Sequence, residues 1–565
     1  RKFGQYTVAD FLAERYGGNG PRSIAIFASI LCSFTYVVAQ IYGVGLIAAR
    51  LTGVAFEVGV FLGVGSILVC SFLGGMRAVT WTQVAQFIVM TFAYLLPVVW
   101  LSVKQTDVPV PQAVYGQQLE KVTQREQVLL HDPKELEVRA IYRRLADELE
   151  AKLDHPFEAL DADRGAAQAR LQQLLEADAL PADISLAERS LASVPKDVSS
   201  AVAQWRKQRE EAEQKAEGLN GMPLHAQPFA GNPHGSPEEQ RLFEVSRRNF
   251  LALVFCLMVG TAALPHILMR YYTVPSVREA RDSVSWTLVF IGILYLTAPA
   301  LALLVKFEIF HELVGTPFKD LPAWVTAWSQ VDGALLSVKD VNADGLLQLN
   351  ELTIGADIIV LATAEIAGLP YVVAGLVAAG GIAAALSTAD GLLLTIANAL
   401  SHDLYYKMVD PKVSNARRVT ISKGVLLLVS LAAAYVAAQK PADILFLVSA
   451  AFSLAASAFF PALVLGIFWK RTTALAALLG MVTGLGVTLY YIATTQPWLR
   501  SVLGLSEPVV LWWGIEPISA GVFGVPVGFV VTVVISWLTP APSKAVQTMV
   551  DELRFPLHEP PDDAH

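Results

Sequence analysis

Long apolar runs separated by short polar loops dominate the chain. Ten of these runs have about 20 residues or more, the length that a helix needs to cross a hydrocarbon core of ~30 Å. They lie at about 23–50, 55–75, 80–103, 248–267, 283–305, 370–401, 417–438, 442–468, 473–495 and 515–538. The runs do not alternate apolar and polar residues as barrel strands do, so the pattern predicts an all-α integral membrane protein with about ten spans.

The composition supports a membrane protein, with 54% hydrophobic and only 16% charged residues among 565. The net charge of −8 resides mainly in one polar segment between spans. We expect the lipid bilayer and a small solute as partners and no nucleic acid. The three cysteines, Cys32, Cys70 and Cys256, fall within predicted spans and indicate no disulfide framework. The oligomeric state is left open.

Basic residues in the short loops gather on one side of the predicted membrane. That side collects Arg1, Lys2, Arg15, Arg22, Arg77, Arg270, Arg278, Arg281, Lys407, Lys412, Arg417, Arg418, Lys470 and Arg471, whereas the other side offers little beyond Lys440 and Arg500. The positive-inside rule makes the basic side cytoplasmic, which places both ends of this chain inside. We therefore expect a multi-pass protein of the cell membrane, most simply a bacterial inner membrane.

Two polar regions divide the spans into groups. The predicted organisation is a first membrane part at 1–103, a soluble helical insertion at 104–247, two spans at 248–305, an external loop at 306–369, five spans at 370–538 and a cytoplasmic tail at 539–565. The insertion is expected outside the cytoplasm as a hairpin or small bundle, either an accessory domain or a partner-binding module. Apolar residues spaced for one helix face are Val138, Ile141, Leu145, Leu149 and Leu153.

The external loop contains a stretch at 340–351 with the spacing of an EF-hand calcium loop. Its expected ligands are Asp340, Asn342, Asp344, the carbonyl of Leu346, Gln348 through water, and Glu351, with Gly345 at the turn. The alternative is an acidic solvent loop that matches the pattern by chance. The flanking sequence shows no helix on each side, so the loop is expected to be isolated and any calcium structural.

The span at 370–401 carries a polar stripe. At 100° per residue the stripe comprises Ala384, Ser387, Thr388, Gly391, Thr395, Asn398 and His402. The hydroxyls of Ser387 and Thr388, with the carbonyl of Ala384, could form part of a cage for a hard cation. The alternative is helix packing through small residues, with both hydroxyls bonded to their own backbone. Asp390 flanks the stripe, where a carboxylate is costly and is expected to face a neighbouring helix and serve binding or coupling.

Four segments together resemble the sodium:solute symporter family. They are AALSTADGLLLTIANALSHDLYYK (384–407), YTVADFLAERYG (6–17), GGMRAVTWTQVAQ (74–86) and GTAALPHILMRYYTVPSVREARDSV (260–284), the last being similar to the acetate (monocarboxylate) permease branch. The resemblance implies an inverted repeat of two five-helix units, the leucine-transporter type of core, and Na⁺ as coupling ion at Ala384, Ser387 and Thr388. Family members begin with three further helices, so this sequence is expected to be an N-terminally truncated fragment. Sugar and proline carriers of the family usually have Asp where this chain has Gln83.

Other polar residues leave alternatives open. Tyr36 and Gln40 in the first span could reach a substrate cavity, although interhelical bonding would explain them equally. Arg270 is either an inner-surface anchor or the partner of Asp403 in a gating ion pair. Glu365 belongs to an outer hairpin or is a solvated carboxylate.

No nucleotide-binding, metal-hydrolase or kinase motif is present, which argues against an enzyme. The expected function is a sodium-coupled secondary symporter that takes up a small organic acid, acetate or a related monocarboxylate. One alternative is a transporter-like nutrient sensor acting with a separate signalling partner. Another is a symporter for a different small solute such as proline.

Overall fold

The computed structural model describes residues 7–73, 76–272, 274, 276–505 and 508–554. Ten apolar helices form the membrane part. They are α2 (Asn19–Thr52), α3 (Phe56–Leu73), α4 (Met76–Thr106), α10 (Pro237–Thr261), α12 (Val277–Glu308), α15 (Tyr371–Asn398), α16 (Asn415–Ala438), α17 (Ile444–Phe468), α18 (Ala474–Thr495) and α20 (Gly521–Leu538). Nine described helices are long and apolar enough to span a membrane, and α3 has a shorter apolar stretch. The predicted all-α membrane class is confirmed; the start of the 74–86 motif, Gly74 and Gly75, lies outside the described residues.

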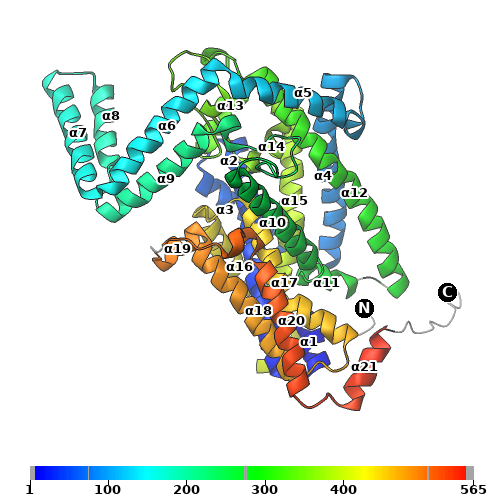
Figure 1. The fold of residues 1–565 in the computed structure, drawn as a ribbon. Coiled ribbons are helices and arrows are strands. Elements are labelled where there is room, and N and C mark those ends of the chain that lie inside the picture. The colour runs from blue at the N-terminus through cyan, green and yellow to red at the C-terminus, as the bar shows by residue number, and fades with distance from the viewer. Residues whose placement is uncertain (1–6, 74–75, 273, 275, 506–507, 555–565) are drawn as a thin grey trace.

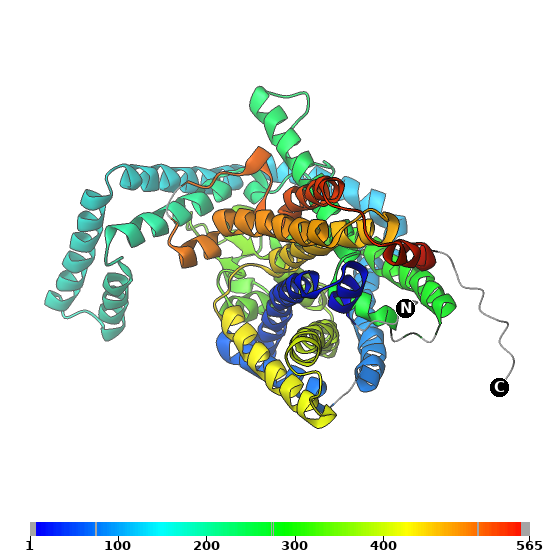
Figure 2. The same ribbon diagram turned by 90° about the horizontal axis from the view of Figure 1, so that it is seen from below.

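Helix α15 lies inside the bundle. It packs against α2 and α4 along most of its length and also contacts α16 and α3. Viewed along the bundle, α15 is surrounded by α2, α16 and α4 (Figure 2). Its first turn is exposed at Tyr371 and Val372, but the part from Ala383 on, which carries the polar stripe, is covered by these neighbours, and this makes polar side chains tolerable there.

The span predicted at 248–267 is interrupted. Helix α10 ends at Thr261, residues 262–264 leave the helical path, and the short α11 (Pro265–Leu268) begins with a proline that has no N–H to donate. Gly260 lies against α17, where a Cβ would come within 2.7 Å of Phe452. Unwound backbone at membrane depth is tolerated where it is buried in protein or lines a cavity, as in transporter binding sites.

The insertion is helical and extends away from the bundle. It contains α5 (Pro111–His131), α6 (Pro133–Asp154), α7 (Pro156–Glu176), α8 (Pro181–Ser193) and α9 (Val198–Ala216). Helices α6 to α9 form an arm at the end opposite to α1 (Val8–Tyr16) and α21 (Lys544–Arg554) (Figure 1).

The buried face of α6 differs from the predicted stripe. Val138 and Leu149 are buried as expected, but Leu145 is 40% exposed and its neighbours Tyr142 and Ala146 are buried instead. Tyr142 and Ala146 share a core cluster with Ala212 and Ala216 of α9. The partner helix thus determines which side of α6 is covered, and this is information that the spacing of leucines does not contain.

The remaining elements frame the end of the bundle that bears the arm. They are α13 (Ala323–Val331), α14 (Ala356–Ile366), α19 (Pro497–Leu503) and an antiparallel pair of short strands, β1 (Leu336–Val338) with β2 (Leu352–Ile354). Helix α15 continues as a π-helical segment, Ala399–Val409, toward the opposite end.

Helices α18 and α20 touch through small residues. A Cβ on Gly524 would lie 2.1 Å from Thr488 Oγ1 and 2.4 Å from the Gly484 carbonyl oxygen, and one on Gly484 would lie 2.9 Å from the Gly524 carbonyl oxygen. Thr488 Oγ1 donates to Ser457 Oγ on α17 at 2.6 Å. Close backbone approach of this kind is how membrane helices gain packing energy without a hydrophobic driving force.

We predict that Gly524→Ala destabilises the protein by about 1–3 kcal/mol, because its methyl group has to displace the Thr488 hydroxyl or separate α18 from α20. Thermal unfolding of purified protein in detergent should show a fall in Tm. Gly486→Ala on α18 is the matched control, since a Cβ there would meet nothing within 4 Å. Equal Tm values for the two variants would contradict the close packing.

Candidate transport site

The oxygens predicted to bind a cation converge on α15. Ser387 Oγ donates to the Ala384 carbonyl at 2.9 Å, and Thr388 Oγ1 donates to the same carbonyl at 3.2 Å. These bonds are the ones that the alternative interpretation describes, in which both hydroxyls bond to their own helix, whereas a cation at Ala384 would need that carbonyl oxygen to turn toward the ion. Each hydroxyl gives its single proton to Ala384, however, and so keeps its lone pairs for a cation.

These hydroxyls line a polar cavity of about 270 Å³. Three elements build its wall: α4, the segment that follows the break after α10, and α15. The lining residues are Gln83, Gln86, Phe87, Met90, His266, Arg270, Ser387 and Thr388. The cavity therefore joins the cation candidate to a guanidinium brought in by the interrupted helix.

Gln83 connects the two sides of this cavity. Its Nε2 donates to the Ser387 carbonyl at 2.8 Å, and its Oε1 accepts from Arg270 Nη1 at 2.6 Å. A carboxylate at this position could accept from Arg270 but could not donate to Ser387. The amide of Gln83 is thus matched to the Ser387 carbonyl and Arg270 together, since it can donate to one and accept from the other.

Arg270 lies against α15 beside Asp390. A Cβ on Gly391 would come within 2.9 Å of Arg270 Nη2, so the missing side chain at Gly391 admits the guanidinium. Asp390 precedes Gly391 on α15 and is only 2% exposed, so a buried carboxylate lies next to the point where the guanidinium approaches the helix. The suggested pair of Arg270 with Asp403 is wrong, because Asp403 accepts from Thr7 Oγ1 at 3.0 Å near Asp10 and His402.

The other candidates for substrate contact, Tyr36, Gln40 and Asn398, do not lie at one site. Tyr36 packs its ring on His266, with centroids 5.7 Å apart, and so reaches the wall of the polar cavity. Gln40 is half-buried one turn further along α2. Asn398 lines a different cavity, of about 570 Å³, together with Thr7 and His402. Sequence reasoning missed His266 as a wall residue; its Nδ1 is shielded from solvent and has no hydrogen-bond partner among the described residues.

Polar side chains connect helices at both ends of the bundle, α2 with α14 at one end and α1 with the extension of α15 at the other. Next to the arm, Arg50 Nη2 lies 2.5 Å from Glu365 Oε1, and Trp328 Nε1 donates to Glu365 Oε2 at 2.6 Å. Glu365 is therefore paired rather than a solvated loop carboxylate. At the opposite end, His402 Nε2 lies 3.1 Å from Asp10 Oδ2, which ties α1 to the extension of α15.

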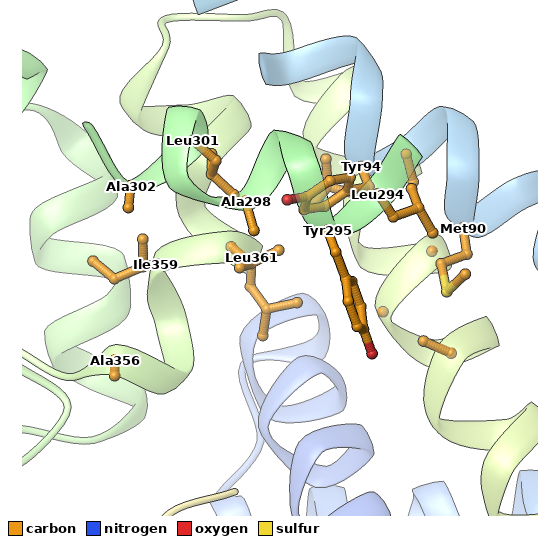
Figure 3. Close-up of a pocket in the computed structure, with 16 residues that line it drawn as sticks. Met90, Tyr94, Leu294, Tyr295, Ala298, Leu301, Ala302, Ala356, Ile359 and Leu361 are labelled. Atoms are coloured by element: carbon orange, nitrogen blue, oxygen red, sulfur yellow. The ribbon is translucent and has the colours of Figure 1, made fainter. Parts of the chain in front are cut away.

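A larger apolar cavity of about 610 Å³ lies beside the polar one. Helices α4, α12, α14 and α15 enclose it, and Tyr94, Tyr295, Leu361 and Met90 stand around it in Figure 3. Met90 lines both cavities, and Ala384 lines the apolar one. Polar and apolar surfaces thus meet next to the hydroxyl pair.

Comparison with known proteins assigns this architecture. The model of the sodium:solute symporter family matches residues 1–117 and 351–484. An uncharacterized symporter from Cupriavidus necator is 51% identical over 560 residues, covering 98% of this chain and 80% of that protein. The chain belongs to the sodium:solute symporter family. It is therefore a multi-pass membrane transport protein that uses sodium as its coupling ion, and not an enzyme.

Two further similarities refine the assignment. A monocarboxylic acid transporter from Corynebacterium glutamicum is 29% identical over 289 residues, which are 50% of this chain and 45% of that protein. The structure of a Na⁺-coupled sialic acid symporter in a substrate-bound outward-open state aligns with a TM-score of 0.50 over 96% of this chain and 79% of that chain, at 15% identity. This structural likeness supports the predicted leucine-transporter type of fold. Residues 118–350, which contain most of the insertion and also the membrane helices α10 and α12, lie outside the family match.

We predict that Asp390→Asn lowers the free energy of unfolding by about 3 kcal/mol, because it leaves the Arg270 guanidinium buried without its counter-charge. The same substitution should slow uptake without changing which solutes are carried. Combining Asp390→Asn with Arg270→Gln removes both charges and should recover most of the lost Tm in detergent. A double variant no more stable than Asp390→Asn alone would show that the two charges are not coupled.

Proposed function

We propose that this symporter carries a small organic acid, acetate or a related monocarboxylate, into the cell together with sodium. The observation that supports this proposal is the polar cavity in which the Arg270 guanidinium faces the Ser387 and Thr388 hydroxyls. A guanidinium offers five donors and pairs with a carboxylate through two parallel hydrogen bonds. Gln83 accepts from one of these donors, Nη1.

The dimensions of the site suit a small acid. A volume of about 270 Å³ holds a carboxylate with a short alkyl group and is below the usual size of pockets for drug-sized ligands. The neighbouring apolar cavity, which shares Met90, would accept the alkyl end. The relative from Corynebacterium glutamicum, whose name specifies monocarboxylic acids, supports the same substrate class.

Sodium is assigned to Ala384, Ser387 and Thr388. An anion on Arg270 would lie on the other side of Gln83 from Ser387, so cation and anion would each reduce the cost of burying the other. Coupling then requires only that sodium binds one conformation of the carrier more tightly than the other. Asp390 would repel a substrate carboxylate, and its proposed role is to compensate Arg270 in the empty carrier.

Uptake by proteoliposomes tests this function against its alternatives. Labelled acetate, propionate and proline are offered with an inward sodium gradient, with a proton gradient, or with neither. Accumulation of acetate or propionate driven by sodium supports the proposal. Preference for proline would favour the alternative solute, and binding without accumulation would favour a sensor.

Replacing both Ser387 and Thr388 by Ala should raise the sodium concentration for half-maximal uptake at least about tenfold, since each tenfold corresponds to ~1.4 kcal/mol and two ligands of a hard cation are lost. Ser430→Ala on α16 is the matched control, because its hydroxyl also donates to its own helix, at Leu426, but lies away from the cavity. Unchanged sodium dependence in the double variant would exclude this site.

Arg270→Gln combined with Asp390→Asn should raise the KM for acetate by about 10-fold or more, because a charge-assisted bidentate contact is lost while no buried charge is left unpaired. Arg278→Gln, an exposed position on α12, controls for a general loss of positive charge. If the neutral pair transports acetate with an unchanged KM, Arg270 does not bind the substrate and serves structure alone.

A further inference from the structure

The loop at 340–351 adopts a compact turn around its acidic side chains. Asp340 Oδ2 accepts from the Gly345 N–H at 3.0 Å, Asn342 Oδ1 from Asp344 at 3.2 Å, and Asp344 Oδ1 from Leu346 at 2.8 Å. Gly345 has φ 77°, which glycine adopts without strain. The flanking elements are the strands β1 and β2 instead of helices, so the loop is isolated, as the sequence indicates.

Several polar atoms inside the loop lack partners. Gln348 is only 5% exposed and donates through Nε2 to Asp344 Oδ2 at 3.1 Å, yet its Oε1 is shielded from solvent without a hydrogen-bond partner. Asp340 Oδ1 is likewise shielded from solvent and has no hydrogen-bond partner in the described part of the chain. Buried acceptors are normally satisfied, so two unsatisfied ones within the same acidic loop call for a cation or an ordered water.

The third carboxylate of the loop, Glu351, is fully buried. Its Oε1 accepts from the Val341 N–H at 2.7 Å and its Oε2 from Gln348 at 3.1 Å. Buried carboxylates are normally paired with a positive charge or bind a metal ion in addition to their hydrogen bonds, so Glu351 is placed as a calcium ligand would be.

The loop holds the arm through hydrogen bonds to α6 and to the end of α9. Glu135 of α6 accepts from the N–H groups of Leu349 at 2.6 Å and Asn350 at 3.3 Å. Asn350 Nδ2 donates to the carbonyls of Lys215 at 2.6 Å and Glu217 at 2.8 Å, at the end of α9. Both helices that lead into the arm are thus held by the last residues of the loop.

One cation of the arm already lies at the loop. Lys134 Nζ is 2.9 Å from Asp344 Oδ2, the oxygen that also accepts from Gln348. Lys134 and Glu135 are neighbours on α6. A change in the charge at Asp344 therefore acts on Lys134, which adjoins Glu135, the residue that holds α6 on the loop. The half-exposed ammonium supplies part of the positive charge that a bound ion would supply.

We propose that the loop binds a calcium ion and that the ion sets how firmly the arm is docked on the transporter. Its ligands are the side chains of Asp340, Asn342, Asp344 and Glu351, the carbonyl of Leu346 and, through water, Gln348. Six or seven oxygens of this kind are what calcium takes in EF-hand loops, and weak sites of extracellular modules have dissociation constants on the order of 10⁻⁴–10⁻³ M. The ion shares Asp344 with Lys134, so calcium and the lysine compete for one oxygen.

Calcium binding to the purified full chain in detergent tests the proposal directly. Protein freed of divalent ions with a chelator is titrated with calcium and, separately, with magnesium, while heat of binding and Tm are recorded. The expected result is saturable calcium binding with a Tm rise of about 1 °C at tenfold excess, and a much weaker response to magnesium. Absence of calcium binding to the wild-type chain up to about 10 mM would overturn the proposal.

Variants separate the loop from other acidic sites. Asp340→Asn and Glu351→Gln should each weaken calcium binding at least about tenfold, whereas Asp320→Asn, an exposed neighbour outside the loop, should bind as the wild type does. Lys134→Met should bind calcium more tightly, because the competing ammonium is gone. Lys134→Met with unchanged affinity would overturn the competition, and Asp340→Asn with wild-type affinity would overturn the site.

Docking of the arm has its own readout. Limited proteolysis between α6 and α9 should be slower with calcium than with chelator in the wild type and equal under both conditions in Asp340→Asn. Identical cleavage of the wild type with and without calcium would show that the ion does not act on the arm. This measurement remains informative if Glu351→Gln fails to fold, since it depends on the wild type and the milder variant.

Discussion

A guanidinium half-buried among membrane helices needs a counter-charge and partners for its donors, and the centre of this transporter is arranged around that requirement. Arg270 follows an interrupted helix, lies against Gly391 and is balanced by Asp390. Gln83 accepts a hydrogen bond from Arg270 and donates another to the carbonyl of Ser387. Because the cost of an isolated charge at this depth is several kcal/mol, none of these residues can be changed alone without consequence for the others.

The same network explains how two substrates of opposite charge can share one small cavity. The hydroxyl pair and Arg270 belong to different elements, α15 and the segment after α10, and Gln83 of α4 spans the gap. A movement of α15 relative to α4 would therefore alter the cation site and the guanidinium together. An ion pair joins α14 to α2 at one end of the bundle, and the His402–Asp10 contact joins the extension of α15 to α1 at the other, so such a movement has to act on these contacts as well.

Much of the fold could be predicted because apolar length and positive-inside charge are local properties of the sequence. The polar stripe of α15 was visible for the same reason, since it repeats with the helical period. The pattern could not provide tertiary contacts or local breaks that depend on them. Examples are the break at 262–264 inside an apolar run, the approach of Arg270 to Asp390, and the pairing of Glu365 with Arg50. Leu145 shows the limit on a smaller scale, because only the position of α9 decides which side of α6 is covered.

The calcium-type loop occupies a place in the chain that gives it influence on transport. It lies between α13 and α14, and these two helices carry Trp328 and Glu365, both part of the cluster that holds Arg50 of α2. The strands β1 and β2 pair directly on either side of the loop, so they transmit its rigidity to both helices. Leu347 adds a second connection by exchanging hydrogen bonds with Gly315 and Thr316, close to the end of α12. The loop thus contacts the arm on one side and connects to Trp328 and Glu365 on the other. A protein that binds to the arm would therefore act, through the loop, on the end of the bundle where Arg50 and Glu365 meet.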